Sequence, residues 1–411
     1  MNNFNKISKC RISGSSNLKT ILNLGNQSLT GVFPKISNQK ITKGPLELVW
    51  CPDSGLVQLK HSYNPSEMYG LNYGYRSGLN NSMVQHLKFK VDRLTTKVKL
   101  DDLDIVLDIG SNDGTLLNSY NNKNIHRIGM DPTAGKFRQY YDENILVIED
   151  FFSKDKFFES SKNKAKIITS IAMFYDLEDP STFVQEISEV LTDDGIWHFE
   201  QSYLPTMLRM NSYDTVCHEH IEYYSLSVIY KLLTKHNLRI IDVELNSVNG
   251  GSFAVTAVKE NSLYLGNGEI VNWLLEQEDR MGLNTLRPYQ AFAKRVSQHR
   301  EDLRNLIIGI RNAGKSVVGY GASTKGNVLL QFCELGPSEI SCIAEVNPEK
   351  FGAYTPGSNI PILSEKEVRA KKPDYMLVLP WHFRDGILQR EKEFLKSGGR
   401  LIFPLPEIEI I

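Results

Sequence analysis

The stretch Asp104-Ile105-Val106-Leu107-Asp108-Ile109-Gly110-Ser111-Asn112-Asp113-Gly114-Thr115-Leu116-Leu117 decides the fold of this protein. It reads as a buried strand that runs into a glycine turn and then into a helix. Residues 105–109 are apolar and mostly β-branched except for Asp108, as expected of a strand covered on both faces. Gly110 and Gly114 allow a ligand to approach the backbone closely. The stretch therefore predicts a ligand-binding turn in an α/β domain.

The residues around this turn indicate which ligand it binds. Asp131 ends the next predicted strand, about 20 residues on, where doubly wound folds place an acceptor for ribose hydroxyls. Acidic residues on both sides of the first turn disfavour a pyrophosphate and suit the amino group of a methionine-like moiety. The pattern resembles the first motif of class I S-adenosylmethionine (SAM) methyltransferases, which implies SAM; a tight turn without a ligand is the alternative. The candidate cofactor contacts are Asp108, Gly110, Asn112, Gly114, Asp131 and Met173.

Length and composition narrow the class of protein. A chain of 411 residues exceeds one hydrophobic core, so we expect two or three domains. Lys and Arg number 47 and Asp and Glu 48, and a net charge of −1 offers no overall attraction to nucleic acid or to an acidic membrane. We find no leader, membrane span or disulfide framework among five scattered cysteines, and therefore expect a cytoplasmic protein that acts on small molecules. The oligomeric state is not indicated.

Residues 1–65 have the short strands and turns of a ribbon-like module. Two segments begin Cys-x-x-Ser-Gly, at Cys10 and at Cys51, and a second cysteine in place of each serine would give two zinc knuckles. Because a serine hydroxyl is a poor zinc ligand at neutral pH, we expect a module without zinc. A site formed by the two cysteines and completed by His61 is the alternative.

Residues 66–260 are predicted to form the central domain. A segment rich in tyrosine, glycine and serine, residues 69–83, precedes a helix at 84–97 and suits a lid over a substrate; a surface linker is the alternative. Strands are expected at 105–109, 125–130, 145–149, 167–173 and 195–200, with an amphipathic helix at 183–191. An antiparallel hairpin at 238–245 and 252–258 would close the sheet, as in class I methyltransferases.

The segment Cys217-His218-Glu219-His220 is the chemically densest part of the chain. A metal site is disfavoured because two histidines at i and i+2 on a non-helical segment lack a clear third ligand. Acid–base catalysis is the favoured interpretation, since histidine titrates near neutrality and a neighbouring carboxylate can orient it. Two buried structural histidines are the remaining alternative.

Residues 261–411 are predicted to form a second, smaller α/β domain. After a charged helical connector at 269–313, the stretch Gly319-Tyr320-Gly321-Ala322-Ser323-Thr324-Lys325-Gly326-Asn327 repeats the theme of strand, glycine loop and helix. Strands are expected at 340–345, 375–379 and 400–403. Hydroxyls and a lysine at a helix N-terminus favour a phosphate-binding loop, and a structural turn is the alternative.

Taken in order, these motifs resemble the three-part sugar C-methyltransferases, which act on nucleotide-linked keto-deoxysugars. The matching segments also include Ser170-Ile171-Ala172-Met173-Phe174-Tyr175-Asp176, Glu200-Gln201-Ser202, Asn249-Gly250-Gly251-Ser252 and Val378-Leu379-Pro380-Trp381-His382-Phe383. The resemblance implies catalytic roles for His220, Glu219, His218, Tyr75 and Tyr73. It implies substrate contacts from Tyr75, Ser77, Cys217, Tyr320, Ser323, Thr324, Lys325 and Asn327. Two departures stand out: serine replaces a cysteine in each zinc knuckle, and Cys217 stands where some members carry tyrosine.

Together the residues and the resemblance predict carbon methylation. A carbon next to a ketone is acidic because its carbanion delocalises onto oxygen, so His220 can remove the proton and the enolate carbon can accept a methyl group. An O- or N-methyltransferase on the same class of sugar is the nearest alternative. An NAD-dependent oxidoreductase is disfavoured because the Gly319 loop lacks a third glycine, and a zinc-ribbon nucleic-acid adaptor because the chain lacks a basic face.

Overall fold

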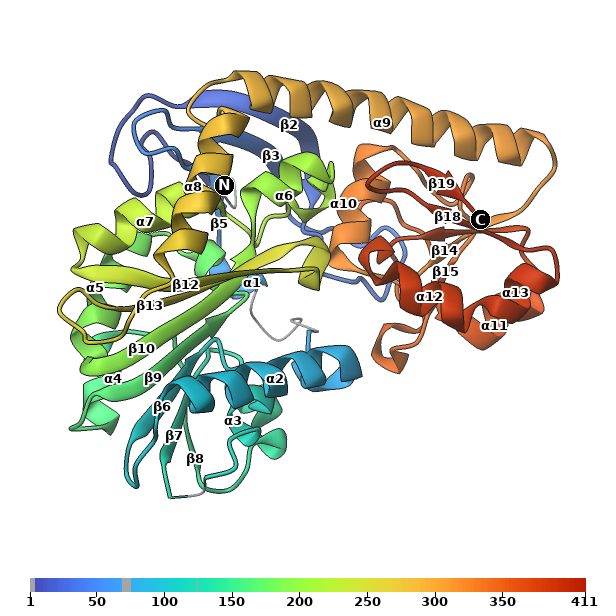
Figure 1. The fold of residues 1–411 in the computed structure, drawn as a ribbon. Coiled ribbons are helices and arrows are strands. Elements are labelled where there is room, and N and C mark those ends of the chain that lie inside the picture. The colour runs from blue at the N-terminus through green and yellow to red at the C-terminus, as the bar shows by residue number, and fades with distance from the viewer. Residues whose placement is uncertain (1–3, 69–74, 123) are drawn as a thin grey trace.

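The computed structural model describes residues 4–68, 75–122 and 124–411. Figure 1 shows a small N-terminal part in blue at the top left, a central α/β part below it, and a C-terminal α/β part in orange and red at the right. We define these parts as residues 4–68, 75–259 and 260–411. The long helix α9 (Arg287–Asn312) runs across the top and packs against β2 (Lys19–Ser28) of the first part and β14 (Val317–Tyr320) of the last.

The central part is built on a seven-stranded sheet in the order β12-β13-β10-β9-β6-β7-β8. Five strands are parallel, and β12 and β13 form the predicted antiparallel hairpin at one edge. This is the sheet of a class I SAM methyltransferase, so the predicted fold class is confirmed. The strands are β6 (Ile105–Ile109), β7 (His126–Met130), β8 (Ile145–Ile148), β9 (Ala165–Ile171), β10 (Leu191–Ser202), β12 (Leu238–Asn246) and β13 (Ser252–Lys259).

The β6 strand lies at the centre of this sheet because both of its faces are apolar. All five of its residues are buried. Leu107 packs in a core with α5 (Pro180–Val190) and α7 (Leu226–Lys235), whereas Val106 packs on the other face with α2 (Asn81–Lys97) and α3 (Thr115–Asn118). The remaining central helices are α4 (Lys154–Ser160) and α6 (Leu204–Arg209), with short 3₁₀ turns η1 (Ser77–Leu79), η2 (Ala134–Tyr140), η3 (Phe174–Asp176), η4 (Tyr213–Thr215) and η5 (Val248–Gly250).

Several predicted element bounds in the central part were wrong: the helix predicted at 84–97 is Asn81–Lys97, and the strand predicted at 195–200 is Leu191–Ser202. The fourth strand ends at Ile171 and not at Met173, because Ala172 takes a left-handed conformation with φ of 55° that breaks the strand. The helix predicted from residue 183 begins at Pro180, since Asp179 caps its N-terminus by accepting from the backbone of Thr182.

The N-terminal part is an antiparallel sheet that borrows a strand from the central part. The sheet runs β11-β4-β3-β2, and β11 (Glu222–Tyr223) follows the His-Glu-His segment directly. Glu222 pairs with Gln58 on β4. The N-terminal part is therefore continuous with the candidate site. The other elements are β3 (Lys43–Trp50), β4 (Val57–Leu59), the β1 (Phe4–Lys6) and β5 (His61–Tyr63) pair, and α1 (Pro65–Met68).

The C-terminal part is a doubly wound sheet in the order β16-β15-β14-β17-β18-β19. Five strands are parallel, and β19 adds an antiparallel edge. The order reverses between β14 and β17, and open sheets of this kind bind ligands at the carboxyl ends of such strands. Its strands are β15 (Ile343–Glu345), β16 (Ile362–Ser364), β17 (Tyr375–Val378), β18 (Arg400–Phe403) and β19 (Glu409–Ile410), and its helices are α10 (Thr324–Phe332), α11 (Glu365–Ala370), α12 (Arg384–Arg390) and α13 (Lys392–Lys396), with η6 (Pro348–Lys350) and η7 (Trp381–Phe383).

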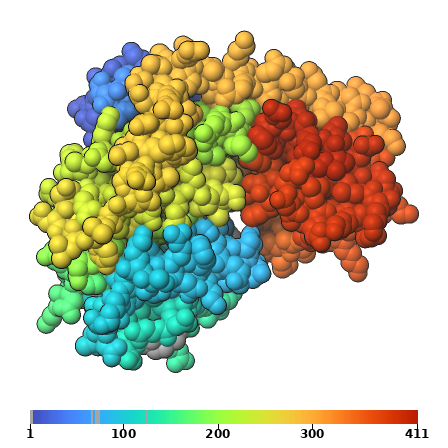
Figure 2. Space-filling model, viewed as in Figure 1, coloured from blue at the N-terminus to red at the C-terminus, as the bar shows by residue number. Residues whose placement is uncertain are grey.

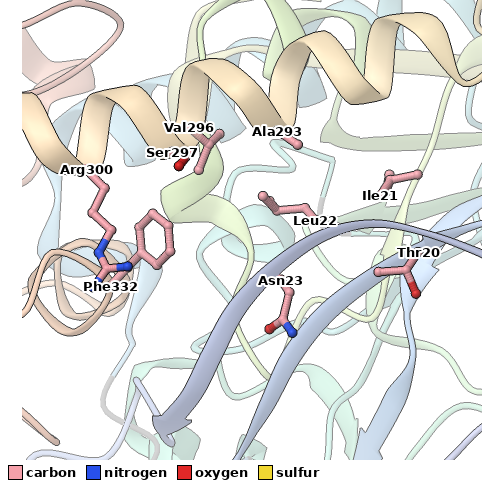
Figure 3. Close-up of a pocket in the computed structure, with 9 residues that line it drawn as sticks. All are labelled: Thr20, Ile21, Leu22, Asn23, Ala293, Val296, Ser297, Arg300 and Phe332. Atoms are coloured by element: carbon pink, nitrogen blue, oxygen red, sulfur yellow. The ribbon is translucent and has the colours of Figure 1, made fainter.

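The predicted helical connector is present as two helices, α8 (Gly268–Met281) and α9, which are separated at Gly282. Within the described residues, no helix is both long and apolar enough to cross a membrane. A hollow of about 330 Å³ lies where α9 meets β2 and α10 (Figure 3). Its charged side chain, Arg300, lies over the ring of Phe332 and pairs with Glu334. We therefore interpret this hollow as a place where elements pack together and not as a catalytic site. Its lining is Thr20, Ile21, Leu22, Asn23, Ala293, Val296, Ser297, Arg300 and Phe332.

Candidate active site

The turn after β6 has the geometry expected of a ligand loop. Gly110 and Gly114 both have positive φ, of 73° and 75°, which favours glycine at each position. A Cβ on Gly110 would lie 3.0 Å from Cγ of Met173, and one on Gly114 would lie 2.6 Å from the ring of Tyr141. A side chain at either position would therefore displace the residues that line the turn.

Asp131 holds this turn from the end of β7. Its Oδ2 accepts from the backbone amide of Asn112 at 2.9 Å, and its Oδ1 accepts from the amide of Thr133 at 2.6 Å. Oδ1 also accepts from the hydroxyl of Thr133 at 2.6 Å, whereas Oδ2 retains a second lone pair that can accept from a hydroxyl of a ribose. The residues of the turn fit the adenosine part of SAM.

Asp108 faces protein rather than an open site. Its Oδ1 accepts from the hydroxyl of Thr169 on the neighbouring strand at 2.6 Å, and only 4% of the residue is exposed. Burial, with the nearby charge of Asp131, raises the pKa of Asp108 to about 7. A contact between Asp108 and the cofactor stays a prediction, because the structure gives this carboxyl a protein partner.

The segment before α2 lies over the cofactor turn. The amide of Ser77 donates to Oδ1 of Asn112 at 3.0 Å, and Nδ2 of Asn112 donates to the carbonyl of Tyr75 at 3.2 Å. The amide of Gly78 donates to Oδ2 of Asp113 at 2.8 Å. The backbone of this segment is therefore tied to the turn as a wall. Tyr73, the other predicted tyrosine, lies outside the described residues.

His220 is oriented as a proton acceptor. Its Nδ1 lies 3.1 Å from the carbonyl of Thr215, which can only accept, so the ring proton is on Nδ1 and the lone pair of Nε2 can accept a proton. The ring packs against Tyr175 with 4.3 Å between centroids. Burial, and then the charge of Lys325, lower the pKa of His220 to about 3. The imidazole is consequently neutral at physiological pH.

The prediction that His218 takes part in catalysis is not supported by its position. His218 is fully buried and lies edge-on to Tyr63 of the N-terminal part, with 4.6 Å between ring centroids. Desolvation lowers its pKa to about 4. The chain bends at His218 and Glu219, so that His218 packs against Tyr63 of the N-terminal part whereas His220 packs against Tyr175 of the central part. A catalytic role for His218 stays a prediction that this position does not favour.

Glu219 and Cys217 lie against each other and the N-terminal part. Burial raises the pKa of Glu219, against hydrogen bonds from Cys217, Thr30 and the amide of Gly31 that lower it. Cys217 is 1% exposed, and burial raises the pKa of its thiol. This burial does not support the predicted substrate contact of Cys217, which stays a prediction.

Lys325 of the C-terminal part faces the same region. Its Nζ donates to the carbonyl of Asn249, at the tip of the central hairpin, at 2.5 Å. Its charge also contributes to the lowered pKa of His382, about 3, which follows first from burial. Nearby, Nε1 of Trp381 donates to Oδ2 of the buried Asp214 at 2.8 Å. The carboxyl-end loops of both sheets thus meet around Lys325, and Figure 2 shows a notch in the surface between α2 and the C-terminal part.

The other predicted substrate residues of the C-terminal loop divide into two groups. Ser323 caps α10 by accepting from the amide of Gly326 at 3.0 Å, and Thr324 begins that helix, so both remain at the loop. Tyr320 and Asn327 do not. The hydroxyl of Tyr320 donates to Glu391 inside the C-terminal part, and Nδ2 of the fully buried Asn327 donates to the carbonyl of Thr30. These protein partners do not support substrate contacts of Tyr320 and Asn327, which stay predictions.

The loop after β14 has the same kind of amide–carboxylate hydrogen bond as the cofactor turn after β6. The amide of Ala322 donates to Oε2 of Glu345 at 2.7 Å, and Glu345 ends the neighbouring strand β15. Asn112 and Asp131 are related in the same way in the central part. The two loops thus share this amide–carboxylate hydrogen bond.

Comparisons with known proteins agree with this arrangement. Three family models match in order: "Putative zinc binding domain" at residues 10–69, "Methyltransferase domain" at 82–243 and "C-methyltransferase C-terminal domain" at 247–406. The C-methyltransferase NovU of Streptomyces niveus is 32% identical over 411 residues, which cover 98% of this chain and 97% of NovU. The chain belongs to the C-methyltransferase family.

Solved structures add distant likenesses to this C-methyltransferase. The complex of the Haloferax volcanii Trm112 methyltransferase activator and its methyltransferase aligns at 14% identity and a TM-score of 0.36, covering 44% of this chain and 94% of that one. Magnesium protoporphyrin IX methyltransferase of Synechocystis PCC 6803, with bound SAM, aligns at 14% identity and a TM-score of 0.33, covering 43% and 79%. The family models and NovU make this C-methyltransferase a SAM-dependent enzyme.

The zinc module of this C-methyltransferase does not have the donor set of a structural zinc site. The four knuckle positions pair off: Sγ of Cys10 lies 3.2 Å from Oγ of Ser54, and Oγ of Ser13 lies 3.6 Å from Sγ of Cys51. The amide of Leu56 also donates to Oγ of Ser54, at 3.1 Å. Thiol–hydroxyl hydrogen bonds therefore cross-link the knuckles, and a tetrahedral zinc site with four good ligands does not fit.

His61 does not complete a zinc site either. It packs edge-on against the ring of Phe4, and among the described residues no group of three or more His, Cys, Asp or Glu could hold a metal. The alternative of a two-cysteine site completed by His61 was therefore wrong.

We expect the purified C-methyltransferase to contain far less than one zinc per chain, because Ser13 and Ser54 replace two thiolates. Elemental analysis tests this, together with the melting temperature before and after a chelator, which should not change. One tightly held zinc per chain, with a chelator-sensitive melting temperature, would contradict the expectation.

Some residues of the site were not predicted from sequence. Thr30 and Gly31 contact Glu219 although they are far from it in the chain. His382 stood in a segment that resembled the family, and Asp214 precedes the segment Cys217-His218-Glu219-His220, but neither received a role. The Thr30–Gly31 dipeptide lies in a loop without a motif, so no local signal could have identified it.

Proposed function

We propose that this C-methyltransferase methylates a carbon next to the ketone of a nucleotide-linked deoxysugar, and that His220 removes the proton from that carbon. The observation that carries the proposal is the orientation of His220, whose Nδ1–H is held by the carbonyl of Thr215 so that the lone pair of Nε2 can accept a proton. Proton removal turns the substrate into an enolate, whose negative charge spreads from carbon to the keto oxygen. Bound SAM supplies the electrophilic methyl group that such a carbon accepts.

We assign roles to the remaining residues from the part of the substrate or cofactor that each could contact. Glu219, whose pKa is raised by burial, can orient His220 or, when protonated, donate to the developing enolate oxygen. Tyr75 and Ser77 stand on the wall over the cofactor turn, where a sugar between SAM and His220 would meet them. Gly110, Asn112 and Asp131 hold the adenosine.

The position of Lys325 favours a negatively charged substrate. An ammonium group beside a glycine loop, where Gly321 has a φ of 79°, matches a diphosphate. After burial, its charge is the second cause that lowers the pKa of His220. A bound diphosphate would offset that charge and make His220 a stronger base only when the nucleotide is in place. The nucleotide would in this way promote the proton transfer.

The proposal is tested by transfer of a labelled methyl group from SAM to a nucleoside-diphosphate keto-deoxyhexose, prepared with a sugar-nucleotide dehydratase. The same sugar without its nucleotide is the matched control. We expect transfer to the nucleotide-linked sugar and a kcat/KM at least about 100-fold lower for the free sugar, since the C-terminal contacts are lost. Equal transfer to both would contradict nucleotide recognition.

The activity should persist at acidic pH. Because burial and Lys325 disfavour the imidazolium form, His220 stays neutral well below the ordinary histidine pKa of 6.5. Replacing Lys325 by methionine removes one of these effects and raises the pKa of His220, so the acid limb of normalised kcat/KM should move to higher pH. Profiles between about pH 3 and pH 8 measure this, because the pKa of His220 is about 3. A wild-type acid limb near the ordinary value, unmoved in Lys325→Met, would contradict it.

A further inference from the structure

The loop after β2 reaches the active site from the N-terminal part. Thr30 is fully buried, and its hydroxyl donates to Oε2 of Glu219 at 3.5 Å. The backbone of Gly31 passes so close that an added Cβ would lie 2.6 Å from Oε1 of Glu219 and 3.9 Å from Oγ1 of Thr324. The carboxylate of Glu219 therefore lies where the N-terminal, central and C-terminal parts meet.

This loop is held in place from the C-terminal side. The carbonyl of Thr30 accepts from Nδ2 of Asn327, and the amide of Ser28 donates to Oε1 of Gln331, both at 2.8 Å. Further along, the amide of Tyr354 donates to the carbonyl of Pro34 at 2.8 Å. The loop cannot move away from Glu219 without breaking its bonds to α10.

The N-terminal part also holds the chain on both sides of Glu219 and His220. His218 lies against Tyr63, and the carbonyl of Ile221 accepts from the amide of Leu59 at 2.8 Å. The next residue, Glu222, is already a strand residue of the N-terminal sheet. The N-terminal part, to which we assign no catalytic group, thus sets the position of Glu219 and His220.

We propose that Thr30 and Gly31 are positioning residues for methyl transfer, which hold the carboxylate of Glu219 next to His220 and the Lys325 loop. The inference rests on the proposed function, because it takes Glu219 and His220 as the groups that act on the substrate. Gly31 is required because any side chain there occupies the space of the carboxylate. The N-terminal module accordingly serves catalysis through this contact.

Gly31→Ala in the full-length protein tests the proposal. The atom that the new methyl group meets is the end of a flexible side chain, so the fold should survive, with an unchanged Kd and KM for SAM. The displaced carboxylate should lower kcat roughly 10- to 100-fold, measured with the nucleoside-diphosphate keto-deoxyhexose as probe. Gly268→Ala, at a glycine with nothing within 4 Å of an added Cβ, is the matched control and should keep its kcat.

A second variant pair tests the hydroxyl of Thr30. Thr30→Val keeps the shape and removes the donor to Glu219, so kcat should fall, whereas Thr30→Ser keeps the hydroxyl and should restore most of it. A kcat of Thr30→Val equal to or above that of Thr30→Ser would contradict the role of this hydroxyl, because packing alone would favour valine over serine.

A double-mutant comparison separates this inference from the proposed function. Glu219→Ala removes the atoms that the alanine at position 31 would meet, so Gly31→Ala should lower kcat no further in that background. The same loss in both backgrounds, or wild-type kcat in Gly31→Ala beside an impaired Glu219→Ala, would overturn the positioning role and leave the proposed function intact. Wild-type kcat in Glu219→Ala would instead contradict the role of Glu219 in the proposed function, and this inference with it.

Discussion

Replacement of His220 by asparagine is expected to lower kcat by roughly 10²- to 10⁴-fold, the range typical for loss of a general base. Asparagine can still donate to the carbonyl of Thr215, but it has no group that can accept a proton from carbon. The Kd for SAM, measured by calorimetry, should stay nearly unchanged, because the cofactor turn lies on other residues. The variant would then bind SAM normally but have a much lower kcat.

The matched control for this variant is His126→Asn, since His126 is an exposed histidine at the start of β7, at the opposite end of that strand from Asp131. It should retain wild-type turnover. Near-normal turnover in His220→Asn would reject the assignment, and the base would then be sought in Glu219 or in Tyr75.

Replacement of Asp131 by alanine should weaken SAM binding by about 1.5 to 3 kcal/mol, which corresponds to roughly 10- to 150-fold in Kd. The variant loses the proposed bond to the ribose and also the acceptor for the amide of Asn112, so the turn loses its support. Calorimetry with SAM measures the effect, and a thermal melt without SAM shows whether the chain is folded.

Asp385→Asn is the control for the change in charge, because Asp385 is fully exposed on α12 in the C-terminal part. Its Kd for SAM should equal that of the wild type. An unchanged Kd in a folded Asp131→Ala protein would overturn the placement of SAM at this turn.

The central fold could be predicted from sequence because its signals are local. Residues 105–109 form an unbroken buried strand, the turn glycines follow at once, and Asp131 ends the next strand as the doubly wound pattern requires. The antiparallel hairpin was predicted because two β-rich runs flank a short glycine turn. Each of these features needs only a few neighbouring residues.

The short elements of the C-terminal part could not be predicted in this way. Strand β16 has three residues and β19 has two, too few to show any period. Both exist because a neighbouring strand pairs with them. The early end of β9, before Ala172, likewise reflects a left-handed backbone, which the residue type alanine does not predict.

The site was predictable in its residue types but not in its geometry. The sequence placed His218 and His220 together, whereas the structure turns one into the N-terminal part and the other toward Lys325. That choice depends on the pairing of β11 with β4, which joins segments more than 160 residues apart in the chain. The contacts of Thr30 and Gly31 with Glu219 are of the same long-range kind.

The most direct test of carbon methylation follows one hydrogen and one methyl group through a single turnover. The substrate is a nucleoside-diphosphate keto-deoxyhexose deuterated at the carbon next to the ketone, and the SAM carries a labelled methyl carbon. We predict by nuclear magnetic resonance that the labelled methyl becomes bonded to that carbon while its deuterium passes to solvent. A methyl group bonded to oxygen or nitrogen, with the deuterium retained on carbon, would contradict the account.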